Sequence, residues 1–163
     1  MKTLYTLIGP KGSGKTYIGS LLDKELHIPF LNVETAVWLH IVPQDMSDAY
    51  FRKGFSKVEE EIHRQFVHTD KLIVDSVGTS PYFVALLDHI RSMYQVKFIK
   101  VVAPLNLCID RIHRRDETLH VPMTEEQIKT MNAQEPLIKN YDLVIINDHI
   151  LDKEIITEFK TLL

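Results

Sequence analysis

The chain has little of several features that define common protein classes: it holds one cysteine and no long hydrophobic run. Cys108 cannot form an internal disulfide, so we expect a reducing compartment and a cytoplasmic protein. No segment approaches the roughly 18 apolar residues of a membrane span. The N-terminus leads directly into an apolar run and does not resemble a signal peptide. The sequence therefore predicts no membrane partner.

An excess of positive charge is also missing, because 19 lysines and arginines are outweighed by 22 acids, for a net charge of −3. We expect no nucleic-acid partner, since such surfaces need clustered cations. The eight histidines show no metal-binding spacing, and structural zinc would need more cysteine. At 163 residues, of which 45% are hydrophobic, the chain is expected to form one domain (1–163), as a monomer or homodimer.

Glycine is scarce too, but four of the six glycines fall between positions 9 and 19. Residues 9–16 fit the pattern G-x-x-x-x-G-K-[ST] directly after an apolar run, which is typical of a phosphate-binding loop between a strand and a helix. In such a loop, backbone N–H groups and the start of the helix bind phosphate oxygens. The predicted cofactor-binding residues are Gly9, Pro10, Lys11, Gly12, Ser13, Gly14, Lys15 and Thr16. Lys15 would contact the β- and γ-phosphates of ATP, and Thr16 would hold Mg²⁺.

Strand and helix patterns alternate along the rest of the chain. The apolar runs predict strands over 3–8, 30–34, 72–75, 96–103 and 143–146, with helices between them. The segment 35–46 predicts only a short helix and a turn, and a long amphipathic helix follows from about residue 47. The fold class is therefore α/β: three layers around a five-stranded parallel sheet, the P-loop NTPase fold. Ligands of such sheets bind at the carboxyl ends of the strands.

Acidic residues stand at two of these strand ends. Asp75 follows Leu72–Val74, the position of an acid that helps to hold Mg²⁺ opposite Thr16; the alternative is an ordinary turn cap. Asn32 and Glu34 end the neighbouring strand and face either the metal, an acceptor substrate or solvent.

The most basic cluster in the chain contains Arg111, Arg114 and Arg115. Guanidinium groups that close over a transferring phosphoryl group stabilise its negative charge. We expect residues 112–123 to form a lid that excludes water; the alternative is a solvated helix end, where arginine also favours the helix dipole. Lys15, Asp75 and these three arginines are the predicted catalytic residues, with Thr16 and Asp75 as metal ligands.

Residues 7–34 with the loop motif, together with the short length, resemble shikimate kinase, and residues 141–148 are more similar to guanylate and other nucleotide kinases. The whole chain thus resembles the P-loop small-molecule kinases. This resemblance implies ATP and Mg²⁺ as cofactors, a lid, and an acceptor-binding helical region over residues 35–66. It also implies acceptor contacts by Glu34, by Gly78 and by either Arg52 or Lys57, and it matches Arg111 to an arginine that leads into the lid.

The sequence therefore predicts an ATP- and Mg²⁺-dependent kinase that transfers the γ-phosphoryl group to a small-molecule acceptor. A nucleoside monophosphate is the first expectation for the acceptor, and a shikimate-like hydroxy acid is the second. The alternative is a P-loop ATPase that acts as a nucleotide-dependent switch or regulatory module, because this fold hosts many functions.

Overall fold

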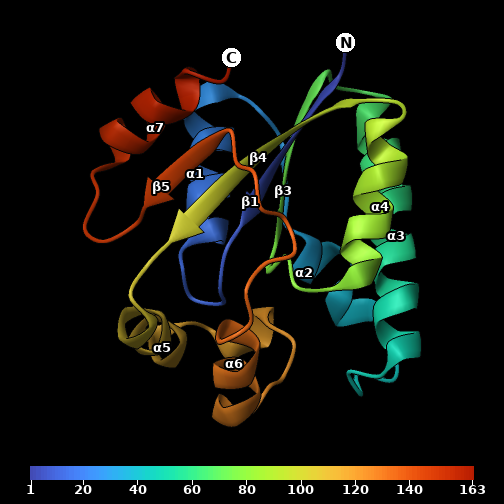
Figure 1. Cartoon of the computed structure of the whole chain (residues 1–163), viewed down its shortest axis with the longest axis vertical. Helices are drawn as coiled ribbons and strands as arrows, with labels where there is room; N and C mark the ends of the chain where they lie inside the picture. Colours follow the sequence, from blue (N-terminus) through green and yellow to red (C-terminus); the bar gives the residue numbers. More distant parts are fainter.

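Five parallel strands form the centre of the computed structural model, which describes residues 1–163. The strands are β1 (Thr3–Ile8), β2 (Phe30–Leu31), β3 (Lys71–Ser76), β4 (Gln95–Val102) and β5 (Leu143–Ile146). Their order in the sheet is β2-β3-β1-β4-β5, and every neighbouring pair is parallel (Figure 1). The predicted five-stranded parallel α/β fold is confirmed.

Helices cover both faces of this sheet, as the continuous apolar strands require. Helices α3 (Asp48–Phe66) and α4 (Pro81–Arg91) share one hydrophobic cluster with β1, β3 and β4. Helices α1 (Lys15–Leu26) and α7 (Asp152–Lys160) pack into a second cluster on the opposite face. All six residues of β1 are buried between these layers, so the strand that leads into the phosphate loop is held rigidly.

Three further helices lie beyond the carboxyl ends of the strands (Figure 1). They are α5 (Leu105–Arg114), the short 3₁₀ helix η2 (Glu117–Leu119) and α6 (Glu125–Asn132). Helix α6 begins with a capping box: the Thr124 side chain accepts from the Gln127 amide, and the Gln127 side chain accepts from the Thr124 amide. Together α5, η2 and α6 cover the edge of the sheet where ligands of this fold bind.

The second strand is shorter than the sequence predicted. It ends at Leu31, and Val33 and Glu34 belong to a short helix, α2 (Val33–Ala36), which the 3₁₀ helix η1 (Trp38–His40) follows. The Asn32 side chain accepts a hydrogen bond from the Thr35 amide at 3.3 Å, so it caps α2 in place of extending the strand.

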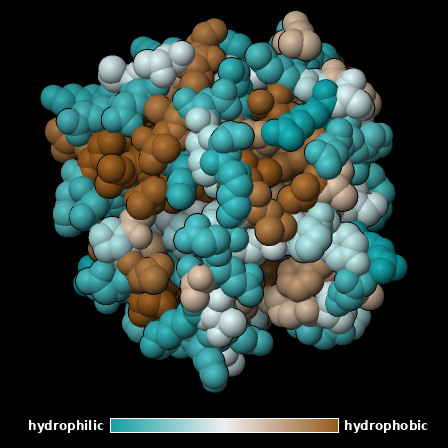
Figure 2. Space-filling model, in the orientation of Figure 1, coloured by the Kyte–Doolittle hydropathy of each residue, from teal (hydrophilic) through white to brown (hydrophobic).

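Exposed hydrophobic side chains gather over one edge of the sheet. Figure 2 shows a hydrophobic area on the side where β5 lies in Figure 1, and Val144 and Ile146 of this edge strand are 49% and 63% exposed. No helix combines the length and the apolar character needed to cross a membrane.

Gly19 lets α1 pack against the start of β2, and this contact yields a prediction. A Cβ atom at Gly19 would lie 2.5 Å from the Phe30 ring. Alanine normally stabilises a helix interior by roughly 0.5–1 kcal/mol relative to glycine, but here overpacking should dominate and lower the free energy of unfolding by about 1–3 kcal/mol. Urea denaturation of Gly19→Ala measures the effect. The exposed neighbour Ser20→Ala is the matched control, and a Gly19→Ala protein as stable as that control would contradict the packing argument.

Candidate active site

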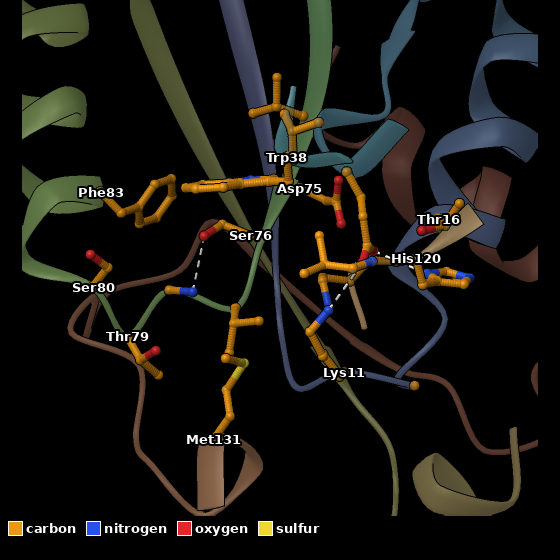
Figure 3. Close-up of a pocket in the computed structure, with 18 of the residues that line it drawn as sticks. Lys11, Thr16, Trp38, Asp75, Ser76, Thr79, Ser80, Phe83, His120 and Met131 are labelled. Atoms are coloured by element: carbon orange, nitrogen blue, oxygen red, sulfur yellow. Dashed lines mark hydrogen bonds and ion pairs between the residues drawn. The ribbon is translucent and has the colours of Figure 1, made fainter. Parts of the chain in front are cut away.

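A large hollow lies between the phosphate loop (residues 9–16) and the helices α3, α4 and α6. Its volume is about 600 Å³, within the range of small-molecule sites. Residues from the phosphate loop, the end of β3, α2, η1, α5 and the segment 147–150 also line it. We call it the central hollow; Figure 3 shows part of it.

The phosphate loop has the backbone conformation that its glycines permit. Gly12 and Gly14 have φ angles of 82° and 97°, which residues with a Cβ atom rarely adopt. Helix α1 begins directly afterwards, with no side-chain cap and no acid in its first turn. Its first N–H groups and the positive end of its dipole are therefore available to an anion.

The carbonyl side of the same loop is occupied by side chains from elsewhere in the chain. The Arg111 guanidinium donates to the carbonyls of Gly12 and Ser13 at 3.4 and 3.3 Å. The Asn147 side-chain amide donates to the Ser13 carbonyl at 2.7 Å. Arg111, predicted as catalytic, thus holds the loop in this structure, and Asn147 performs a role that sequence reasoning missed. Its position at the end of β5, beside the predicted ligand edge, was the available signal.

Lys15 is only 7% exposed and folds back over the loop. Its ammonium group donates to the carbonyls of Gly9 and Pro10 at 2.8 and 2.9 Å. Burial lowers the pKa of Lys15 to about 8, and the nearby carboxylate of Asp75 opposes this shift only in part. The lysine is therefore a cation that a phosphate would stabilise.

Asp75 and Thr16 both line the central hollow and offer oxygen ligands to a metal ion. Figure 3 shows the two side chains on the same side of the hollow. The Asp75 Oδ1 atom is buried without a hydrogen-bond partner. Burial raises the pKa of Asp75, although the charge of Lys15 acts against the increase. A buried, unpartnered carboxylate oxygen beside a hydroxyl fits a hard cation such as Mg²⁺.

Glu34 connects the phosphate loop with the predicted lid. Its carboxylate lies 3.3 Å from the Lys11 ammonium and 3.0 Å from Nδ1 of His120, and it accepts from the Val121 amide at 2.8 Å. Burial raises the pKa of the Glu34 carboxyl, but Lys11 and the bonds from His120 and Val121 outweigh that effect and leave it below the ordinary value. Asn132, at the end of α6, adds two hydrogen bonds with the backbone of Lys11. His120 and Asn132 were not among the residues singled out in the sequence.

The three predicted arginines do not all line the central hollow. Arg115 lines the central hollow, whereas Arg114 is exposed and is not part of its lining. Arg111 lies in the last turn of α5, and Arg115 is the residue after the helix, whose extended backbone takes its side chain in a different direction from that of Arg114. The joint placement of all three arginines over the site is corrected to Arg111 and Arg115.

Only two of the four residues predicted to contact the acceptor line the central hollow. Glu34 and Gly78 line the central hollow, while Arg52 and Lys57 do not. Arg52 pairs with Asp48 at 2.9 Å and bonds the hydroxyl of Tyr82 on α4 at 3.3 Å, and Lys57 pairs with Glu60 at 2.6 Å. Both cations are largely exposed. The lining stripe of α3 passes through Phe51, Phe55, Val58 and Ile62, and neither cation lies on it.

Comparison with known proteins adds to this geometry. The family model described as "Shikimate kinase" matches residues 11–163. A curated shikimate kinase from Flavobacterium psychrophilum is 29% identical over 75 residues. That alignment spans 44% of this chain and 43% of the relative, so it covers less than half of either protein.

Solved structures share the fold over nearly the full length. A shikimate kinase from Aquifex aeolicus has a TM-score of 0.58 at 20% identity, covering 98% of this chain and 94% of its own. A gluconokinase from Sinorhizobium meliloti has a TM-score of 0.68 at 16% identity, with coverages of 96% and 88%. An APS kinase from Mycobacterium tuberculosis has a TM-score of 0.66 at 18% identity, with coverages of 99% and 96%. With its phosphate loop, its buried lysine and acid, and a family match over most of its length, the chain belongs to the shikimate kinase family of P-loop small-molecule kinases.

Proposed function

We propose that the protein is an ATP- and Mg²⁺-dependent kinase that transfers the γ-phosphoryl group to a hydroxyl group of a small molecule. One observation carries the proposal: the central hollow extends from the phosphate loop into a second compartment between α3, α4 and α6. A protein that only binds or hydrolyses ATP has no need for such a compartment. Family membership supports the same conclusion.

The residues at the junction of the two compartments suit phosphoryl transfer. Lys15 would leave the carbonyls of Gly9 and Pro10 to bind the phosphates, and Thr16 and Asp75 would hold Mg²⁺. When bound, this ion neutralises charge on the phosphate oxygens. The Glu34 contacts with His120 and Val121 close one side of the hollow, which excludes water and favours transfer over hydrolysis.

A nucleoside monophosphate and a shikimate-like hydroxy acid were the acceptors expected from the sequence. The family match favours a hydroxyl acceptor of the second kind over a phosphate acceptor. The cations first expected to bind an anionic acceptor, Arg52 and Lys57, lie outside the central hollow, so neither supports a charged group there.

The first test is ADP production from ATP and Mg²⁺ against a panel of nucleoside monophosphates, nucleosides, shikimate and simple alcohols. We expect at least one hydroxyl acceptor to stimulate ADP production strongly, and Lys15→Ala to abolish the stimulation while the protein stays folded by circular dichroism. Equal, slow hydrolysis with every acceptor would support a nucleotide-dependent switch and contradict the kinase.

A second prediction concerns the pH dependence of nucleotide binding. The pKa of Lys15 in the free protein is about 8, and bound phosphates would raise it, so binding takes up a proton above that pH. Affinity for a non-hydrolysable ATP analogue should therefore be roughly tenfold weaker at about pH 9 than at about pH 7. Calorimetry measures this change. Lys15→Met, which carries no titrating amine, should bind weakly with no such pH dependence; a wild-type affinity that stayed constant would refute the role of Lys15.

A third prediction separates the two neighbouring arginines. Arg115→Ala should lower kcat about 100-fold with little change in the affinity for ATP, because Arg115 lines the central hollow and can approach charge that develops during transfer. Arg114→Ala, at an exposed position on the same helix, is the matched control and should retain activity within about twofold. An equal loss of kcat in both variants would contradict the role that we assign to Arg115 as a residue lining the hollow.

A further inference from the structure

The positive charges that line the central hollow all come from one side. Every lining lysine or arginine belongs to the phosphate loop or to α5 and its C-terminal cap: they are Lys11, Lys15, Arg111 and Arg115. Helices α2, η1, α3, α4 and α6, which surround the second compartment, contribute none. The compartment that would hold the acceptor therefore has no cation on the walls formed by these helices.

Aromatic side chains form much of these walls. The Trp38 ring lies 4.9 Å from Phe55 and 6.2 Å from Phe51, and Phe55 lies 5.8 Å from Phe83, measured between ring centroids. Figure 3 shows the Trp38 ring across the hollow between Phe83 and Asp75, with Met131 entering from α6 on the opposite side. The space between Trp38 and Met131 suits a flat or apolar body.

The position of Trp38 depends on a glycine in the middle of α3. A Cβ atom at Gly54 would lie 1.8 Å from the Trp38 ring. Glycine is unfavourable at an interior helix position, so α3 carries a local cost that makes room for the indole. The aromatic wall is thus built into two elements, η1 and α3.

One carboxylate and three hydroxyl groups line the side of the hollow formed by β3 and the start of α4. Asp75 offers its unpartnered Oδ1 atom toward the phosphate loop, Ser76 lies next to it, and Thr79 and Ser80 lie on the side of Phe83 (Figure 3). Ser76 and Ser80 accept hydrogen bonds from backbone amides, so each hydroxyl proton remains free to be donated. The Asp75 oxygen can accept a hydrogen bond from an acceptor hydroxyl, whereas its carboxylate would repel an anionic group placed beside it.

An acceptor that buried a carboxylate or phosphate against these walls would lose its hydration without gaining an ion pair. The charge of Lys11 is already paired with Glu34 at 3.3 Å, and Arg111 is bonded to loop carbonyls. Arg115 lies 3.4 Å from the Glu117 carboxylate and enters the hollow from the cap of α5, on the side of the phosphate loop. Arg52 and Lys57 pair with acids of α3 and are largely exposed. An anionic acceptor therefore has no available partner at the aromatic end of the central hollow.

We propose that the acceptor is an uncharged alcohol with an aromatic or aliphatic ring, which packs between Trp38 and Met131 and presents its hydroxyl at the Asp75 end. This inference rests on the proposed kinase function. The hydroxyl oxygen forms a bond to the γ-phosphorus while the bond from that phosphorus to the bridging oxygen of ADP breaks. The hydroxyl proton leaves to solvent, and the products are a phosphate monoester and ADP.

The test uses matched pairs of alcohols that differ only in a carboxylate: shikimate methyl ester against shikimate, and benzyl alcohol against para-carboxybenzyl alcohol. Trp38 is the only tryptophan in the chain, so its fluorescence reports binding without requiring turnover. In each pair, the neutral member should change this fluorescence with an affinity at least roughly tenfold higher than the charged member. The neutral members should also stimulate ADP production.

A charge added to the wall should reverse this preference. Met131→Lys places an ammonium group opposite Trp38 and should improve binding of the charged member of each pair by about tenfold or more. Ala133→Lys lies at the end of the same helix, is exposed and does not line the hollow. It is the matched control and should leave the preference of the wild-type protein unchanged.

Two results would overturn the inference: equal or tighter binding of the charged members by the wild-type protein, or no change in Trp38 fluorescence with any member of either pair. Either result is compatible with the proposed kinase function if another acceptor stimulates ADP production. Conversely, binding of the neutral members at Trp38 without any acceptor-stimulated ADP production would support the apolar site and refute the transfer reaction. The two proposals therefore fail in different ways.

Discussion

The site depends on how the peptide groups of the phosphate loop are oriented. Lys15, Arg111 and Asn147 bind carbonyl oxygens of residues 9, 10, 12 and 13. When Lys15 turns to a phosphate, Arg111 and Asn147 still hold the carbonyls of Gly12 and Ser13, so this part of the loop needs no reorganisation to direct N–H groups toward an anion. Cys108 supports the same arrangement from α5, because its carbonyl would lie 2.3 Å from a Cβ atom at Gly12. Residues from two distant parts of the chain, α5 and the end of β5, thus hold the loop together with its own Lys15.

Burial of charge beside this loop is tolerated because lysine and acid are close to each other. The charge of Asp75 partly offsets the effect of burial on Lys15, and the charge of Lys15 does the same for Asp75. The carboxylate still keeps an unpartnered oxygen, and such a group is costly to the fold. A ligand that bonds to this oxygen would remove the energetic cost of leaving it unpartnered. This agrees with the fit of the site to Mg²⁺ and phosphate.

Much of the fold could be predicted from the sequence, because local patterns determine it. Apolar runs indicated the five strands, and the glycine-rich pattern of residues 9–16 indicated the loop between β1 and α1. The orientation of exposed cations could not be predicted in the same way. Arg52 follows Phe51 in the sequence, and Arg114 precedes Arg115; Phe51 and Arg115 line the central hollow, whereas the two neighbouring arginines do not. Whether such a side chain points into the hollow depends on which face of its helix packs inward. The aromatic wall around Trp38 was also missed, because it arises from contacts between η1, α3 and α4 that no local pattern encodes.

The two hydrogen bonds between Asn132 and the backbone of Lys11 join the last turn of α6 to the phosphate loop. A covering segment attached only through side chains can swing away while the loop below stays still. Here the Asn132 side chain bonds both the N–H and the carbonyl of Lys11, so a displacement of α6 would break two bonds to the main chain of the loop. While α6 is docked, the Lys11 N–H group is occupied by Asn132 and does not count among the amides that the loop can offer to a phosphate.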